Sequence, residues 1–246
     1  MKARVKYLLQ KVLGFGNYLF IFSLFKIRTL NRDGNEKDFL YFLKLIPPGG
    51  IILDIGANIG IMTVHLARGV KNSTVLAFEP VPYNMRALHR VIAFYKLSNV
   101  RVFGCALGNS NGTAEIVMPV MDRVKMQGLS HIVHQSIPEN NEGEKFTTEV
   151  KKLDAMDEVM NGKARVTAVK MDVENFEYFV LDGAREMLRK YKPLIYCELW
   201  DNENRRKCFE LLHSLGYEAK ILVAGSLTAC TKEALMEHPT QNFFFL

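Results

Sequence analysis

The chain has 246 residues, of which 48% are apolar, and a formal net charge of +6. This length suits one α/β domain with additions or two small domains, and no low-complexity tract or repeat is visible. The four cysteines form no C-x-x-C pair, which argues against a zinc site and a disulfide framework and fits a reducing cytoplasm. Cys105 and Cys197 fall at predicted strands and are expected to be small buried core residues.

The excess positive charge is concentrated at the N-terminus. Residues 1–28 contain six basic and no acidic side chains, so residues 29–246 are balanced, with 32 − 6 = 26 basic against 26 acidic groups. A protein that acts on nucleic acid more often spreads basic residues over its working face, so no nucleic-acid partner is expected. We predict that residues 1–35 are an extension appended to one domain over residues 36–246.

The N-terminal extension carries apolar residues at helical spacing. Gln10 and Lys11 interrupt the apolar stretch and no small-residue cleavage site follows, so a signal peptide is not expected. The aromatic-rich run at 18–25 is too short to span a bilayer. Two interpretations stay open: a helix packed on its own domain or on a partner subunit in a homo-oligomer, or an interfacial anchor at the inner face of a membrane. The predicted stripe consists of Val5, Leu8, Leu9, Val12 and Leu13.

The most informative stretch runs from Ile51 to Gly60. Five residues, four of them apolar, predict a strand buried on both faces, and a glycine-rich turn leads into a helix. Gly56 lets the backbone turn, and Gly60 lets a ligand or a strand approach the helix closely. The dinucleotide fingerprint needs glycine at the first, third and sixth positions. Here they hold Gly56, Asn58 and Ile61, so the fingerprint fails.

Two acidic residues point to a different cofactor. Asp54, which leads the turn, would oppose a pyrophosphate but suits an ammonium group. The next predicted strand, 74–78, ends in Glu79, nineteen residues past Gly60, where a carboxylate can accept hydrogen bonds from both ribose hydroxyls. S-adenosylmethionine (SAM) carries an ammonium, a carboxylate and a sulfonium but no phosphate, so the pattern favours SAM. The alternative is a helix-packing turn followed by a surface glutamate.

Strands and helices alternate over the rest of the chain. This alternation predicts an α/β fold with one Rossmann-like, doubly wound and mostly parallel sheet. The two last strands, 217–223 and 242–246, are expected to pair antiparallel at the sheet edge. Further strands are predicted at 100–103, 113–118, 166–171 and 194–197, with helices at 36–46, 82–95, 176–188 and 202–215.

Residues 119–146 interrupt this alternation. They lack clear periodicity, and so long an irregular insertion is usually functional or disordered, so we expect a substrate-side lid. His131 and His134 could share a metal ion by their spacing. No cysteine and no acidic residue at fixed spacing accompanies them, so they are expected to be lid or surface histidines and no metal ligand is predicted.

Carboxylates follow the predicted strands at the sheet edge where α/β proteins bind ligands. Asp172 and Glu198 end strands that should neighbour the first strand, and Glu174 and Glu177 follow Asp172 closely. A hydroxyl group that is to be alkylated must lose its proton, and a carboxylate of raised pKa can take it. The candidate catalytic residues are therefore Asp172, Glu174, Glu177 and Glu198. Helix capping or ion pairing stays open for Glu174 and Glu177, and metal binding stays open for Asp172 and Glu198.

Three motifs in order resemble the FkbM-type SAM-dependent methyltransferases over roughly residues 36–246. Their joint occurrence is specific, whereas each motif alone is weak. One position departs from the family pattern, because Asn175 stands where glycine usually follows Asp-Val-Glu; asparagine tolerates a positive φ better than most residues. The motifs are the run 54–60, the run 78–80 with Pro82 and Asn84, and the run 170–174 with Glu177.

The resemblance implies the seven-stranded SAM-methyltransferase fold and an O-methyl transfer, often onto a sugar hydroxyl of a polysaccharide or natural product. By match to the family, the methionine part of SAM would be held by four residues and the ribose by Glu79. A nicotinamide-dependent oxidoreductase and a non-catalytic SAM-binding module stay open as alternatives. The four residues implied for the methionine part are Asp54, Gly56, Asn58 and Gly60.

Overall fold

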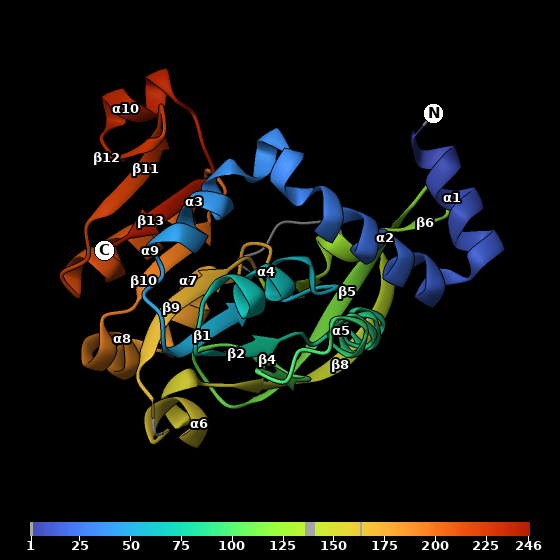
Figure 1. Ribbon diagram of the computed structural model, residues 1–246, viewed down its shortest axis with the longest axis horizontal. Helices are drawn as coiled ribbons and strands as arrows, with labels where there is room; N and C mark the ends of the chain where they lie inside the picture. Colours follow the sequence, from blue (N-terminus) through green and yellow to red (C-terminus); the bar gives the residue numbers. More distant parts are fainter. Residues whose placement is uncertain (1, 136–140, 163) are drawn as a thin grey trace.

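The computed structural model describes residues 2–135, 141–162 and 164–246. Its centre is an eight-stranded sheet in the order β12-β11-β13-β10-β9-β1-β2-β3 (Figure 1). The strands from β10 to β3 are parallel, whereas β13, β11 and β12 run antiparallel to their neighbours. The predicted α/β fold with a mostly parallel sheet is therefore confirmed. The strands are β1 (Gly50–Ile55), β2 (Ser73–Phe78), β3 (Val100–Phe103), β9 (Val166–Met171), β10 (Leu194–Glu198), β11 (Ala219–Val223), β12 (Ser226–Ala229) and β13 (Asn242–Phe245).

The sheet has eight strands and not the seven that were expected, and the additional strand lies at one edge. Strands β11 and β13 pair antiparallel as predicted, with Ala219 opposite Phe245. The additional strand β12 folds back on β11 through Ala224 and Gly225, which both have positive φ, 49° and 86°. A two-residue turn with positive φ at both positions matches the twist of hairpin strands, so the chain forms a hairpin here.

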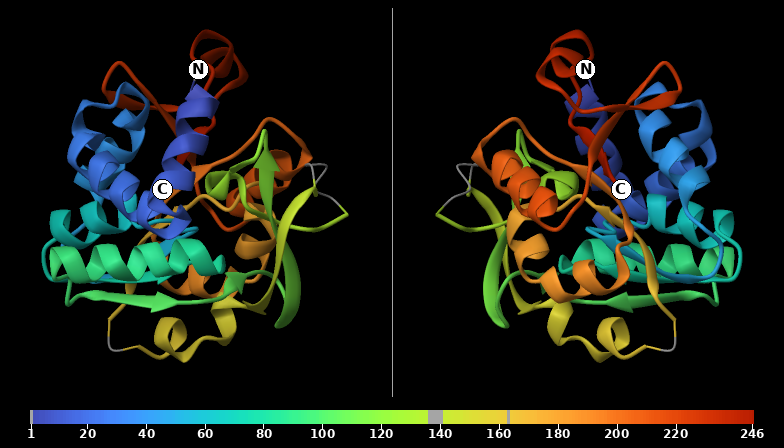
Figure 2. Two further views of the ribbon diagram at one scale, coloured as in Figure 1. Left: turned by 90° about the vertical axis from the view of Figure 1, so that its right-hand side faces the viewer. Right: turned by 90° about the vertical axis from the view of Figure 1, so that its left-hand side faces the viewer.

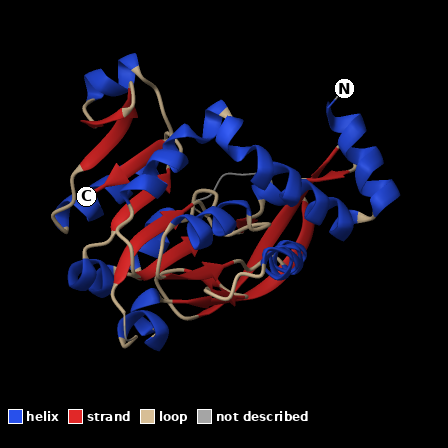
Figure 3. Cartoon of the chain, in the orientation of Figure 1, coloured by secondary structure: helices blue, strands red, loops and turns tan. Residues whose placement is uncertain are grey.

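Helices cover both faces of the central sheet (Figures 2 and 3). Alternate residues of β1 point to opposite faces. Ile52 belongs to the core beneath α3 and α4, and Leu53 to the core beneath α7, α8 and α9. The ends of β1 and its parallel neighbours therefore lie between two helical layers. These helices are α3 (Lys37–Leu45), α4 (Ile61–Gly69), α5 (Pro82–Tyr95), α6 (Asp157–Met160), α7 (Glu177–Asp182), α8 (Arg185–Tyr191), α9 (Glu203–Ser214) and α10 (Lys232–Glu237), with the 3-10 turns η1 (Leu30–Arg32), η2 (Gly34–Glu36) and η4 (Leu153–Ala155).

A second, smaller sheet has the strand order β4-β8-β5-β6, with β7 paired to β5. The expectation of irregular structure after Met118 is therefore wrong in part, and residues 136–140 lie outside the described residues. Local periodicity missed this sheet because its main pairing joins distant segments, with Gly112 opposite Val150. Its elements are β4 (Ala106–Leu107), β5 (Gly112–Met121), β6 (Val124–Lys125), η3 (Gln127–Leu129), β7 (His131–Ile132) and β8 (Gly143–Lys151).

The N-terminal segment forms two helices, α1 (Lys2–Leu13) and α2 (Phe15–Thr29). They meet at Gly14, whose φ is +72°, and their axes are bent by 116°. Helix α2 packs against α4 and α5 and buries Leu19 and Ile27. Within the described chain, no single helix is long and apolar enough to cross a bilayer, although α1 and α2 pass that test together as a bent pair.

Candidate active site

The turn after β1 is built on close backbone contact. Gly56 has a φ of +74°, and a Cβ added there would overlap the backbone carbonyl oxygen of Asp172. Gly60 has a φ of +85°, and an added Cβ would meet Leu88 Cδ1 at 2.8 Å. The backbone N–H groups of Gly56 and Ala57 donate to the Phe78 carbonyl, at 3.1 and 3.0 Å. Gly56 therefore lets the ends of β1, β2 and β9 meet without a side chain between them, and Gly60 lets the start of α4 lie close to α5.

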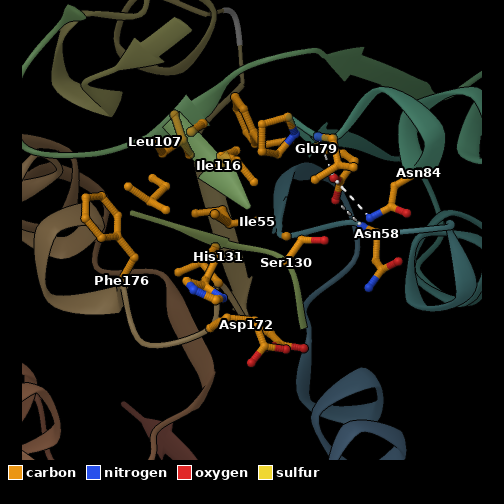
Figure 4. Close-up of a pocket in the computed structure, with 18 of the residues that line it drawn as sticks. Ile55, Asn58, Glu79, Asn84, Leu107, Ile116, Ser130, His131, Asp172 and Phe176 are labelled. Atoms are coloured by element: carbon orange, nitrogen blue, oxygen red, sulfur yellow. Dashed lines mark hydrogen bonds between the residues drawn. The ribbon is translucent and has the colours of Figure 1, made fainter. Parts of the chain in front are cut away.

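Glu79 ties the end of β2 to this turn. Its side chain is buried, with one carboxylate oxygen accepting from the Asn58 N–H at 2.8 Å and the other from the Val81 N–H at 2.8 Å. Asn84 Nδ2 donates to the second oxygen at 3.3 Å, and Figure 4 shows these side chains together at one side of a cavity. Burial raises the pKa of Glu79 to about 7, against the opposing effect of these hydrogen bonds.

This first cavity has about 610 Å³ of empty space and lies beyond the ends of β1, β2 and β9. Glu79 lines one side and Asp172 another, with Ile55 between them (Figure 4). No lysine or arginine lines it within the described parts of the chain. The segment predicted to be a substrate-side lid also contributes. Its η3, its β7 and the residue between them supply Gln127, Gly128, Ser130, His131 and Ile132.

Three buried amide oxygens of residues that line the first cavity have no hydrogen-bond partner within the described chain: those of Asn58, Asn84 and Gln127. Asn84 is 1% exposed and Gln127 is 6% exposed, and their Oδ1 and Oε1 atoms are unsatisfied. Buried polar atoms are nearly always hydrogen-bonded, so these acceptors call for donors from a bound molecule. Asn84 stood in a recognised motif without an assigned role, and Gln127 was missed because it lies in the stretch without periodicity.

Asp54 lies beneath the turn, not on the cavity wall. It is fully buried, accepts from Thr63 Oγ1 at 2.6 Å and lies 3.6 Å from Lys170 Nζ. Lys170 Nζ also donates to the Gly56 carbonyl at 2.9 Å. Burial alone would lower the pKa of Lys170, but Asp54, Asp172 and other carboxylates together raise it. Lys170 belongs to the motif at 170–174, but its pairing with Asp54 was not predicted, although a lysine inside an apolar strand signals a buried partner.

Two further cavities adjoin the first on the side of β9 and β10. The second cavity, about 660 Å³, shares Gly56, Asn58 and Gln127 with the first and adds Phe22 and Glu36. The third cavity, about 700 Å³, contains Glu36, Lys170, Asp172, Tyr196 and Glu198, among others. Asp172 lines all three cavities and therefore stands where they meet.

The carboxylates that line the third cavity change one another's pKa. Burial and repulsion from Asp172 raise the pKa of Glu198 to about 7, while Lys170 opposes the shift. Burial also raises the pKa of Glu36, a residue from η2 that was not among the candidates. A carboxylate with a pKa near neutrality is suited to accept a proton at that pH. Among the described residues, no group of three or more His, Cys, Asp or Glu side chains is arranged to hold a metal ion.

Glu174 and Glu177 have different surroundings although they are close in sequence. Glu174 lines the first cavity and has a φ of +52°. Glu177 is 2% exposed, and its Oε1 accepts from the N–H groups of Val173 and Asn175, at 3.0 and 3.3 Å. The structure therefore places Glu177 beneath the loop after β9, where it holds the backbone. Burial raises the pKa of Glu177 to about 8.

Asn175, which replaces the glycine of the family pattern, has a φ of +72°. The position therefore does require a left-handed backbone, as its usual glycine suggests. The asparagine side chain also has partners, because its Oδ1 accepts from Asn202 Nδ2 at 2.8 Å and from Asn204 Nδ2 at 3.1 Å. These bonds join the loop after β9 to the start of α9.

The chain is similar in sequence to known methyltransferases. The family model described as Methyltransferase FkbM domain matches residues 54–219, which is 166 of the 246 residues. Methyltransferase 1 of Beauveria bassiana is 31% identical over 160 residues, 59% of this chain and 63% of that protein. Methyltransferase sdnD of Sordaria araneosa is 26% identical over 203 residues, 74% of this chain and 78% of that protein.

A solved structure shares the fold. The crystal structure of methyltransferase FkbM from Methylobacillus flagellatus aligns with a TM-score of 0.52 at 18% identity. The alignment covers 80% of this chain and 44% of that one, so the chain spans less than half of that protein's length. The family match reaches from Asp54, near the end of β1, to the first residue of β11 and so includes most of the lining of the first cavity. The chain therefore belongs to the FkbM family of SAM-dependent methyltransferases.

Proposed function

We propose that this chain transfers the methyl group of SAM to a hydroxyl group of a carbohydrate or a related polyhydroxylated small molecule. The observation that carries the proposal is the position of Asp172 at the meeting point of the three cavities, next to Glu198 with its raised pKa. A methyl donor in the first cavity and an acceptor in the third would approach each other at this carboxylate.

The residues of the first cavity fit SAM. Bound there, SAM supplies an electrophilic methyl group. The unsatisfied oxygens of Asn58, Asn84 and Gln127 can accept hydrogen bonds from its ammonium or hydroxyl groups. Glu79 accepts three hydrogen bonds and has one acceptor site left, on Oε2, for a ribose hydroxyl. The turn at Gly56, with Asn58, leaves room for the methionine part, whereas Gly60 packs against Leu88 and lines none of the three cavities. We propose that Asp54 acts indirectly, by holding Lys170 and through it the Gly56 carbonyl.

The third cavity supplies the proton acceptor. Glu198 takes the proton of the attacking hydroxyl group, and Asp172 accepts a hydrogen bond from the acceptor and so orients it. Methyl transfer is an in-line displacement, so holding the acceptor in place contributes much of the rate. Lys170, whose Nζ lies between Asp54 and the Gly56 carbonyl, limits the repulsion among these carboxylates.

The lining of the third cavity favours a polyhydroxylated acceptor. Its side chains include the amides of Asn35 and Asn242 and the carboxylates of Glu36 and Glu198. Amides and carboxylates side by side offer both donors and acceptors, which vicinal hydroxyl groups match. A nicotinamide dinucleotide would bring a pyrophosphate into the first cavity, which has no lysine or arginine among its described lining residues to meet it.

The test is transfer of tritium from methyl-labelled SAM to a panel of neutral saccharides, with simple amines and carboxylic acids as comparison acceptors. We expect label on a saccharide, with the new carbon identified by NMR as a methyl ether. Asp201→Asn, a change at an exposed carboxylate just past Glu198, is the matched control and should keep parent activity. Transfer only to nitrogen or to carboxylates would overturn the proposal, and tight retention of SAM without any transfer would favour a non-catalytic module.

A further inference from the structure

Helix α1 presents its apolar side to the outside. Val5, Leu8, Leu9 and Val12 are 53%, 58%, 43% and 72% exposed. Their spacing of three, four and seven residues places them in one stripe along the helix. Leu13, the last residue of the predicted stripe, is partly buried against α2. The stripe that the sequence predicted therefore exists, but the domain does not cover it.

The opposite side of α1 holds the helix on the domain through polar groups. Gln10 is buried, donates through Nε2 to the Lys125 carbonyl at 3.1 Å and accepts from the Lys125 N–H at 3.1 Å. Lys6 Nζ contacts Met126 Sδ at 3.5 Å. Figure 1 shows α1 beside β6 at one end of the molecule. A helix of a globular domain normally buries its apolar stripe and exposes its polar side, and α1 does the reverse.

The surroundings of the stripe are cationic. Every charged residue before Asp33 is basic. Arg4 and Lys11 are exposed on α1, where helical spacing places them beside the stripe. On α2, Ile21 and Phe25 are 50% and 60% exposed, and Arg28 is exposed as well. An apolar stripe bordered by basic residues is the pattern of a helix that lies in the headgroup region of a membrane.

We propose that α1 and the outer side of α2 dock on an anionic lipid surface. Charge decides between this occupant and a second copy of the chain, because two copies would bring basic groups against basic groups, whereas anionic headgroups complement them. Docking does not depend on the proposed methyl transfer. The docking surface is also connected to the candidate active site, because α2 supplies Phe22 to the lining of the second cavity.

The test is co-sedimentation of the full chain with vesicles of phosphatidylglycerol and phosphatidylcholine, compared with vesicles of phosphatidylcholine alone. We expect binding to the anionic vesicles, weakened by raising the salt concentration. Leu8→Asp with Val12→Asp should lower the vesicle affinity at least tenfold, and Lys11→Gln about fivefold. Met236→Asp, at an 85% exposed residue of α10 at the other end of the molecule, is the matched control and should bind like the parent.

Sedimentation velocity without lipid, and thermal melting of each variant, complete the experiment. All substituted side chains are exposed, so the variants should melt like the parent. The proposal is overturned if the parent ignores anionic vesicles at low salt. It is equally overturned if the parent sediments as a dimer that Leu8→Asp with Val12→Asp converts to a monomer, because the stripe would then be an interface between copies.

Discussion

The two sides of the candidate site are built differently. On the side of β1 and β2, Glu79 accepts two backbone hydrogen bonds and the turn at Gly56 is fixed by contact with the loop after β9. On the side of β9 and β10, burial raises the pKa of Glu198, and repulsion from Asp172 raises it further. The side of β1 and β2 is held in place by hydrogen bonds and backbone contact, whereas the side of β9 and β10 brings two carboxylates close together.

This difference matches two tasks. A binding surface gains from groups that are held in place before the ligand arrives, because less freedom is lost on binding. A proton acceptor gains from a pKa near the working pH, which requires unfavourable surroundings for its charge. The pKa of Glu79 is also raised to about 7, but Glu79 already accepts three hydrogen bonds that hold it in place, so we assign cofactor binding to the first side and proton transfer to the second. The following changes test this division, beginning with one at the contact between the two sides.

The largest effect is expected for Gly56→Ala. The added Cβ would overlap the Asp172 carbonyl oxygen, so the loops after β1 and β9 must separate, and we expect a loss of more than about 3 kcal/mol or no folded protein. Gly49→Ala is the control, because Gly49 has a similar φ of +79° but nothing within 4 Å of the added Cβ, so its cost should be about 1 kcal/mol. Thermal melting compares them, and equal melting temperatures would disprove the close contact.

The next effect concerns Glu198, the proposed proton acceptor. The pKa of Glu198 is raised to about 7, so the turnover of the parent should rise as the pH passes through 7, where the carboxylate ionises. Glu198→Gln should lower turnover about 10²–10⁴-fold and remove this rise. SAM affinity, measured by calorimetry, should stay near the parent value.

Asp172→Asn refines the same comparison. It removes the charge that repels Glu198, so the pKa of Glu198 should fall and the rise of turnover should move to lower pH. Turnover itself should also fall because the orienting carboxylate is lost. An unchanged midpoint in Asp172→Asn would show that the two carboxylates do not interact, and the division between the sides would need revision.

A smaller effect is expected at the cofactor side for Gln127→Ala. Removing the buried amide deletes one acceptor for SAM, and the dissociation constant should rise roughly 5–100-fold. Gln10→Ala is the matched control: Gln10 binds Lys125, two residues before Gln127, but lines none of the three cavities. Calorimetric titration with SAM measures both. An equal loss of SAM affinity in the two variants would mean that both act by destabilising the segment 119–146 and that Gln127 does not bind SAM directly.

The smallest effect is expected for Glu177→Gln. Between the ordinary pKa of 4.5 and the folded value of about 8, the native state keeps a proton that the unfolded state releases. The stability contribution of Glu177 is therefore largest at low pH and falls as the pH rises through this window. The melting temperature of Glu177→Gln minus that of the parent should therefore be several degrees larger at pH 8 than at pH 5. The conversion is about 2–4 °C per kcal/mol for a chain of this size. Glu186→Gln, at an exposed carboxylate, should show no such trend.

The sequence predicted the cofactor side better than the acceptor side. The strand from Gly50, the turn at Gly56 and the position of Glu79 follow from local patterns: an apolar run, a glycine and an acidic residue at a strand end. Lys170 and Gln127 could not be placed in this way. The role of Lys170 depends on the register of β1 with β9, where it lies opposite Asp54, and Gln127 is brought in by a pairing between distant strands.

The acidic lining of the first cavity has a consequence for turnover. Glu79, Asp172 and Glu174 line it, and no lysine or arginine does so within the described chain. SAM carries one net positive charge, and it becomes a neutral thioether once its methyl group has left. With SAM in the first cavity as proposed, the attraction between the lining and the sulfonium is lost at the moment of transfer, whereas the ammonium group keeps its charge. We therefore expect the demethylated cofactor to bind less tightly than SAM, by a margin that shrinks as the ionic strength rises.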